Sequence, residues 1–140
     1  DGESVKVGNK TIKPDQVLDK PIPGKKITYV PDTRPCAAAV ELAMGSDALI
    51  HEATFSHELQ DSAIEGKHST AKEAAQIAKR AKVKKLYLNH ISQRYKDPKI
   101  LEKEAREVFP ESYLAEDFDT IMLYAYFLPG QSKRLLSCHC

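Results

Sequence analysis

The amino-acid sequence predicts an α/β fold built in layers, and two observations point to it. Short apolar runs rich in β-branched and aromatic residues recur along the chain, and helical patterns separate them, which gives the order β-α-β-α-β-α-β. The chain has 140 residues, of which 41% are hydrophobic and 29% are charged. That length and composition are typical of one globular domain with a buried core.

Residues 1–25 are predicted to form a hairpin followed by a connector. Apolar and polar residues alternate on both sides of Gly8-Asn9, as in two short strands joined by a tight turn. Pro14 suits an early position in a single helical turn. Two prolines and a glycine between residues 19 and 26 indicate a connecting segment.

The predicted layers lie in residues 26–128. We expect strands at 26–30, 47–53, 85–90 and 119–128, and helices at 36–44, from Thr70 onward and after Asp97-Pro98. Pro35 suits the first position of the first helix, with Asp32 or Thr33 as its cap, and Gly45 ends it. Residues 54–67 are expected to form a loop, with or without a single helical turn. Residues 129–140 are expected to form a loose tail.

The helix that begins at Thr70 has the most specific pattern. Thr70 and Glu73 have the spacing of a capping box. Five alanines then share one face, which would let the helix lie close to a sheet: Ala71, Ala74, Ala75, Ala78 and Ala81. In the last helix the inward positions are expected to be Ile100, Leu101, Ala105 and Val108.

Composition narrows the function classes. The formal net charge is +1, so any site for a polyanion must be local. Three cysteines are too few for a disulfide framework, which favours a reducing compartment. Because no apolar run reaches the length of a membrane span, we expect a cytoplasmic protein without a membrane partner.

Metal-binding and proton-transfer side chains follow three successive predicted strands. Asp32 follows the first strand, His51 and Glu52 end the second, and His90 ends the third, while His68 precedes the capped helix. Ligands of α/β sheets bind at the carboxyl ends of the strands, where such loops converge. Imidazole and carboxylate suit a divalent metal such as zinc. Asp32 and His90 supply two ligands, and the third is either His68, Glu52 or a residue outside this set.

Each of these residues also has a purely structural interpretation. Asp32 could be only a helix cap, His90 a strand-end histidine, and Glu52 the partner of a cation. His51 and Glu52 point to opposite faces of their strand, so one of them is structural. His57, in a polar segment, is expected to be solvated.

Two further groups could bind phosphate. Arg34 and Arg94 could each hold a phosphate through two parallel hydrogen bonds. Ser69, Thr70 and the free N–H groups at the start of their helix would form a second anion site.

Four motifs, taken in order, resemble the C-terminal half of the ribonuclease Z family, the transfer-RNA 3′ processing endonucleases of the metallo-β-lactamase superfamily. They are "PDTRPC", "DALIHEATF", "KHSTAKEAAQIAKRAKVKKLYLNHISQRY" and "YLAEDFDTI", and the resemblance covers residues 4–122. It implies half of an αββα sandwich that binds two zinc ions, a precursor transfer-RNA substrate and a homodimer in the complete enzyme.

The resemblance also implies roles for individual residues. Asp32 would bridge the two metals and His90 would bind the second. His68 would protonate the leaving oxygen, and Glu52 would orient His68. Ser92 and Arg94 would lie near the phosphates of the RNA end.

The chain departs from the family in ways that leave three functional hypotheses. The family's H-x-H-x-D-H motif is absent from these 140 residues, and Pro31 stands where the family has glycine. The first hypothesis is the C-terminal half of a transfer-RNA 3′ endonuclease, active only with an N-terminal half. The second is an inactive truncated half-domain or assembly module, and the third is another phosphodiesterase of the superfamily.

Overall fold

A computed structural model describes residues 3–17, 24–124 and 135–139. Its centre is a sheet of four parallel strands in the order β3-β4-β5-β6. These strands are β3 (Ile27–Val30), β4 (Ala48–Glu52), β5 (Leu86–Asn89) and β6 (Ser112–Leu114). The helices are α1 (Ala37–Ala43), α2 (Gln60–Gly66), α3 (Ala71–Ala81) and α4 (Lys99–Val108), with short 3₁₀ turns η1 (Pro14–Gln16) and η2 (His57–Leu59).

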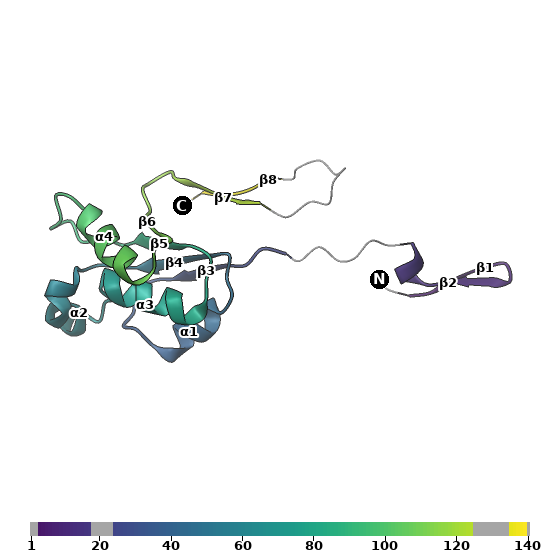
Figure 1. Ribbon diagram of the computed structural model, residues 1–140, viewed down its shortest axis with the longest axis horizontal. Coiled ribbons are helices and arrows are strands. Elements are labelled where there is room, and N and C mark those ends of the chain that lie inside the picture. Colours follow the sequence, from purple (N-terminus) through teal and green to yellow (C-terminus); the bar gives the residue numbers. More distant parts are fainter. Residues whose placement is uncertain (1–2, 18–23, 125–134, 140) are drawn as a thin grey trace.

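The helices lie together on one side of this sheet (Figure 1). Strand order follows chain order without a reversal, and right-handed crossovers then place every connecting helix on the same face. An α/β sheet with its helices on one face agrees with one half of an αββα sandwich. The predicted fold class is therefore confirmed.

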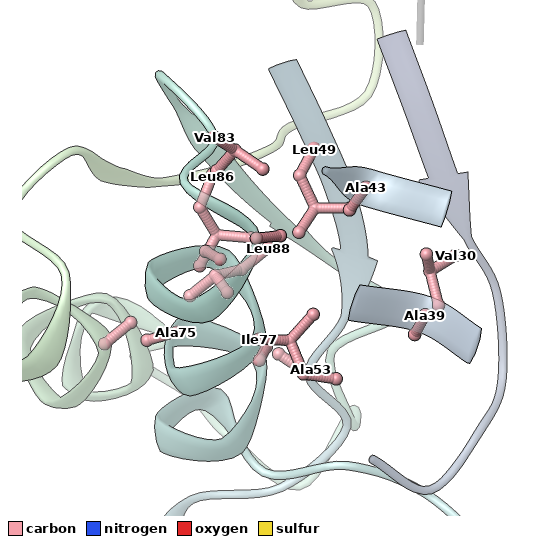
Figure 2. Close-up of a cluster of buried hydrophobic side chains, with 14 of the residues drawn as sticks. Val30, Ala39, Ala43, Leu49, Ala53, Ala75, Ile77, Val83, Leu86 and Leu88 are labelled. Carbon is pink, nitrogen blue, oxygen red and sulfur yellow. The ribbon is translucent and has the colours of Figure 1, made fainter. Parts of the chain in front are cut away.

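The core fills the space between the sheet and α3 (Figure 2). All five predicted alanines of α3 have no exposed surface, so the helix lies close to β4 and β5. Leu49, Leu86 and Leu88 fill that interface and are also fully buried. Burial of each such leucine contributes roughly 1.5–3 kcal/mol.

The capping box predicted at the start of α3 is present. The Thr70 hydroxyl accepts a hydrogen bond from the Glu73 N–H at 3.2 Å, and a Glu73 carboxylate oxygen accepts one from the Thr70 N–H at 2.9 Å. The predicted N-terminal hairpin is also observed, as β1 (Val5–Val7) paired with β2 (Lys10–Ile12), with Gly8 at a φ of +61°.

The start of α1 differs from the prediction. Cys36 is the N-cap residue and makes no side-chain capping bond, so Pro35 lies before the helix. The Thr33 hydroxyl instead donates to the Arg34 carbonyl, and Asp32 lies beside His90. Both proposed caps are therefore engaged elsewhere. The end of the helix agrees with the prediction, because Gly45 adopts a φ of +66°.

The expected loop at 54–67 contains the helix α2. Because α2 buries only Ala63, its residues show no helical pattern of apolar positions. In α4, Leu101 and Ala105 are buried as expected, but Ile100 is 46% exposed and does not face the core.

The C-terminal prediction needs two corrections. The fourth strand of the sheet is the three-residue β6, too short to show an alternating pattern. The apolar run at 119–128 contributes β7 (Thr120–Tyr124), which pairs antiparallel with β8 (Leu135–His139) in the segment expected to be a loose tail. The rest of that run, like most of the connector at 19–26, lies outside the described residues, and the domain boundaries at 25 and 128 stay predictions.

Candidate active site

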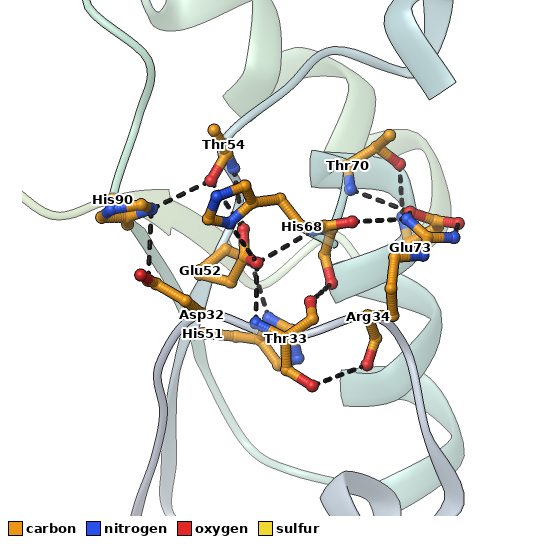
Figure 3. A network of polar contacts seen from close by, with 11 residues as sticks. Asp32, Thr33, Arg34, His51, Glu52, Thr54, His68, Thr70, Glu73 and His90 are labelled. Carbon is orange, nitrogen blue, oxygen red and sulfur yellow. Dashed lines mark hydrogen bonds and ion pairs between the residues drawn. The ribbon is translucent and has the colours of Figure 1, made fainter. Parts of the chain in front are cut away.

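Asp32, His68 and His90 meet at the carboxyl edge of the sheet (Figure 3). Asp32 follows β3, His90 follows β5, and His68 lies just before α3. One ligand atom from each residue lies within 4.8 Å of the others. Two ligands of one zinc ion lie at most about 4 Å apart, since each bond is near 2 Å. The donor atom types therefore suit a divalent metal, and the three atoms would have to move slightly closer together for all of them to bind one ion.

The buried side chain of Glu52 connects the loops that carry this cluster. Its side chain has no exposed surface. Oε1 accepts hydrogen bonds from the Thr33 N–H at 2.9 Å, the Ser69 N–H at 3.0 Å and His68 Nδ1 at 3.1 Å. An ionised carboxylate only accepts, so Nδ1 of His68 is the donor in this contact. The alternative in which Glu52 serves only as the partner of a cation does not hold, because its donors include main-chain N–H groups and a hydroxyl beside the imidazole.

Thr54 connects Glu52 to His90, and the sequence analysis missed it. Its hydroxyl donates to Glu52 Oε2 at 2.8 Å. With that proton used, the hydroxyl must accept from His90 Nδ1, which lies 2.9 Å away. Asp32 Oδ1 lies 3.3 Å from the same nitrogen. Nε2 of His90 is therefore left free to bind a metal, the usual effect of a partner on the other ring nitrogen.

His90 has an unusual backbone for its residue type. Its φ is +54°, in the left-handed region that non-glycine residues seldom occupy. Such conformations cost of order 1–3 kcal/mol and persist where surrounding contacts impose them. Here the Thr54 and Asp32 contacts hold the ring, so the turn out of β5 points His90 at the cluster.

The loop after His90 is fixed to the loop after Glu52. The Ser92 N–H donates to the Thr54 carbonyl at 3.2 Å, and the Tyr95 hydroxyl accepts from the Ser56 N–H at 2.7 Å. These bonds hold the predicted phosphate-binding segment beside the metal cluster. Tyr95, like Thr54, has no sequence signal of its own, because its role depends on a contact 39 positions away.

Arg94 is exposed and lies at the side of the cluster. Its guanidinium carbon is 4.7 Å from the centre of the Phe55 ring, and its Nε donates to the Ser92 hydroxyl at 3.1 Å. Phe55 also lies beside His68, with ring centres 6.1 Å apart. The structure therefore brings Ser92 and Arg94 next to the cluster, with part of the guanidinium fork facing solvent.

The other predicted phosphate ligands have partners inside the protein. The Ser69 hydroxyl donates to the Thr33 carbonyl, its N–H donates to Glu52, and Thr70 caps α3. The Ala71 N–H donates to the Phe55 carbonyl. Ser69 and Thr70 are fully buried, so the expected anion site at this helix start is not formed. Arg34 pairs with Glu73 and also differs from its expected role.

The two remaining histidines of the central domain lie outside the cluster. His51 is fully buried on the helix side of β4, opposite Glu52 as predicted, with Nδ1 2.7 Å from the Glu52 carbonyl oxygen. Burial lowers the pKa of His51 below 6.5, so its ring is neutral at pH 7. His57 is half-buried rather than solvated, and its main-chain N–H donates to a Glu104 carboxylate oxygen at 2.9 Å.

None of the helices within residues 3–17, 24–124 and 135–139 has the length and apolar character needed to cross a membrane.

Comparison with known proteins identifies the family. The sequence model of the beta-lactamase superfamily domain matches residues 17–91, which is more than half of the chain. The chain belongs to the beta-lactamase superfamily. Among solved structures, a metallo-beta-lactamase fold protein of Bacillus subtilis is similar to it with a TM-score of 0.59 and 26% identity, over 64% of this chain and 36% of that one.

Within the superfamily, the resemblance to ribonuclease Z is confirmed. The ribonuclease Z of Archaeoglobus fulgidus is 52% identical over 84% of this chain and 39% of its own length. The ribonuclease Z of Methanothermobacter thermautotrophicus is 45% identical over 89% of this chain and 41% of its own length. The short form of human tRNase Z is similar in structure, with a TM-score of 0.55 and 38% identity over 69% of this chain and 32% of that one. The chain thus spans about two fifths of the length of its curated relatives.

Proposed function

We propose that this superfamily domain is the C-terminal half of a zinc-dependent endoribonuclease that removes the 3′ trailer from precursor transfer RNA. The observation that carries the proposal is the convergence of Asp32, His68 and His90 at one edge of the sheet, with Glu52 holding His68. The similarity to proteins named ribonuclease Z and tRNase Z supports the same substrate.

Asp32 and His90 are the residues that would hold the metal. A divalent ion bound there would neutralise phosphate charge and ease the ionisation of water at neutral pH. The Asp32 carboxylate is 57% exposed and His90 is 48% exposed, so both can also be reached by the substrate and by ligands from another part of the protein.

His68 is suited to protonate the leaving group. In the protonated ring, Nε2–H would face the substrate while Nδ1–H donates to Glu52. When water that has lost a proton to solvent attacks the phosphorus, the bond to the 3′ oxygen breaks and that oxygen takes the Nε2 proton. This leaves a 3′ hydroxyl on the transfer RNA and a 5′ phosphate on the trailer. The buried Glu52 carboxylate stabilises the imidazolium before the transfer and fixes the ring orientation.

Ser92 and Arg94 would bind the phosphates at the RNA end. Arg94 offers a planar donor fork held by the Phe55 ring, and the Ser92 hydroxyl lies next to it. These contacts would be local, in keeping with a chain whose net charge is only +1.

We infer that the remaining metal ligands come from an N-terminal half. A catalytic zinc takes three protein ligands and a two-metal site takes more, whereas this cluster offers three donors of which His68 is assigned to proton transfer. Two zinc ions, a homodimer and a cytoplasmic location belong to the same proposal and rest on the resemblance to ribonuclease Z.

The test uses the full-length protein that contains these residues, with zinc and a precursor transfer RNA carrying a 3′ trailer. His68→Ala should lower turnover by roughly 10²- to 10⁴-fold, the range for loss of a general acid, while the zinc content stays the same. His57→Ala is the matched control, since His57 lies outside the cluster, and should leave turnover unchanged.

Three results would count against the proposal. Hydrolysis of cyclic nucleotides without cleavage of transfer RNA would indicate another phosphodiesterase of the superfamily. Absence of both activities would favour an inactive module. Loss of zinc in His68→Ala would make His68 a metal ligand instead of the acid.

A further inference from the structure

Arg34 is engaged in a partly buried network beside the catalytic cluster. Its Nη1 donates to Glu73 Oε2 at 2.9 Å, and its Nη2 donates to Glu73 Oε1 at 2.5 Å. Nη1 also donates to the main-chain carbonyl of His68 at 2.5 Å. The Glu73 side chain is 8% exposed and that of Arg34 is 30% exposed. The guanidinium fork is therefore occupied by the protein and not presented to a phosphate.

We propose that Arg34 and Glu73 form a positioning pair that fixes His68 relative to Asp32. The inference deepens the proposed function, and its effect on turnover rests on that function. Arg34 is two residues after Asp32, so a bond from its side chain to the His68 carbonyl ties the metal-binding loop directly to the proton-donating residue (Figure 3).

Two other cross-links run between the same loops. The Ser69 hydroxyl donates to the Thr33 carbonyl at 2.6 Å, and the N–H groups of Thr33 and Ser69 both donate to Glu52 Oε1. Glu52 orients the ring of His68, whereas Arg34 holds its main chain. Together these contacts determine where the imidazole lies when a substrate phosphate reaches Asp32.

Glu73 gives this pair a rigid base. The same carboxylate caps α3 through the Thr70 N–H and accepts from Gln60 Nε2 at 3.3 Å. Burial opposes ionisation, but the hydrogen bonds and charge of Arg34 outweigh it and hold the pKa of Glu73 below its usual value. The pair therefore stays charged at neutral pH. Because Glu73 belongs to the first turn of α3, its bonds to Arg34 fix the guanidinium that holds the His68 carbonyl.

Geometry makes arginine specific for this position. A guanidinium supplies donors in a fixed plane and can bind both carboxylate oxygens and a carbonyl together. A lysine ammonium keeps the charge but cannot match that fork. Arg34→Lys therefore separates positioning from charge, and Glu73→Gln changes the same pair from its other end.

The kinetic test uses the full-length enzyme and precursor transfer RNA. Arg34→Lys and Glu73→Gln should each lower kcat by about 10-fold, typical of a lost supporting partner, with KM nearly unchanged. The double variant should be no slower than either single variant, because both changes break one link. Arg94→Lys is the matched control, and it should raise KM because Arg94 faces the substrate.

An increase in KM with normal kcat in Arg34→Lys, together with wild-type kinetics in Glu73→Gln, would overturn the proposal and make Arg34 a substrate ligand. Additive losses in the double variant would also overturn it, because they would show two independent effects.

A second measurement does not depend on activity. Nitrogen–proton NMR correlations of the His68 ring should show one tautomer, protonated at Nδ1, in the wild-type protein. A mixture of tautomers is expected in Arg34→Lys and in Glu73→Gln, with the protein still folded. An unchanged ring signal in both variants would refute the positioning role. If the wild-type protein fails to cleave RNA, the proposed function fails, while the ring signals still decide on the pair.

Discussion

Strand β4 has a buried or nearly buried carboxylate at each end, and their surroundings differ. Asp47, just before the strand, accepts from Lys84 Nζ at 2.8 Å, Lys25 Nζ at 3.2 Å and the Lys26 N–H at 2.9 Å. Glu52, at the other end, accepts from main-chain N–H groups, the Thr54 hydroxyl and a histidine. The first site is an ion-pair cluster and the second is a hydrogen-bond hub.

The difference indicates what each end of the sheet does. At Asp47 the positive charges of two lysines stabilise a carboxylate, and the Lys26 main-chain N–H adds a donor fixed by the backbone. At Glu52 each donor is fixed by the backbone or by a short side chain, so the carboxylate sets the orientation of other groups. We infer that Asp47, at the amino edge of the sheet, stabilises the fold, whereas Glu52, at the carboxyl edge, orients the side chains of the cluster.

Glu52→Gln should have the largest effect, because the amide nitrogen would face donors that need an acceptor. We expect cleavage by the full-length enzyme to fall by about 100-fold through the loss of His68 orientation. Unpaired buried N–H groups should lower the free energy of unfolding by about 2–4 kcal/mol. Kinetics and urea titration measure the two quantities. Normal cleavage in a folded Glu52→Gln variant would show that the hub has no role in orientation.

Thr54→Val should weaken metal binding more than it weakens the fold. Without the hydroxyl, His90 Nδ1 loses its closer partner, and we expect zinc affinity to fall by roughly 10-fold. Thr28→Val is a matched control, because Thr28 is also buried and its hydroxyl contacts Ser46 and the Leu42 carbonyl instead of His90. Competition titrations with a zinc chelator compare the two. Equal losses of affinity would mean that the effect is not specific to His90.

Asp47→Asn should affect stability alone, by about 1–2 kcal/mol at pH 7, since Lys84 is an exposed partner. Burial raises the pKa of Asp47, but the hydrogen bonds from Lys84, Lys26 and Lys25 lower it to about 2, from an ordinary value of 3.8. Because the folded-state pKa is the lower one, this contribution is complete above pH 3.8 and disappears as pH falls towards 2.

Denaturation curves for wild type and Asp47→Asn should therefore converge at low pH, while zinc affinity and cleavage stay at wild-type values. A loss of cleavage in folded Asp47→Asn would contradict the division between the two edges.

The amino-acid sequence was sufficient for those parts of the fold that depend on local patterns. The capping box at Thr70, the alanine face of α3 and the strand that precedes His90 are all encoded within about a dozen neighbouring residues. The edge of the sheet at which Asp32, Glu52 and His90 meet also follows from local information, since parallel strands end on one side. His68 was a candidate third ligand from its place before the capped helix, and its role as the proton donor came only from the resemblance to a known family.

The parts that the sequence could not predict depend on contacts between distant segments. Thr54 and Tyr95 act through partners 36 and 39 positions away. Arg34 had the chemistry of a phosphate ligand, but Glu73 occupies it, and that pairing exists only after α3 has folded against the loop. The helix α2 and the strand β6 were missed because each buries few residues.

A crystal structure of the full-length protein grown with zinc, with anomalous data collected at the zinc absorption edge, tests the central claim most directly. We expect a zinc peak about 2.0–2.2 Å from the Asp32 carboxylate and from Nε2 of His90, with His68 bonded to Glu52 through Nδ1. A zinc peak away from Asp32 and His90, or the two side chains pointing into different layers of the fold, would contradict a metal centre at this edge of the sheet.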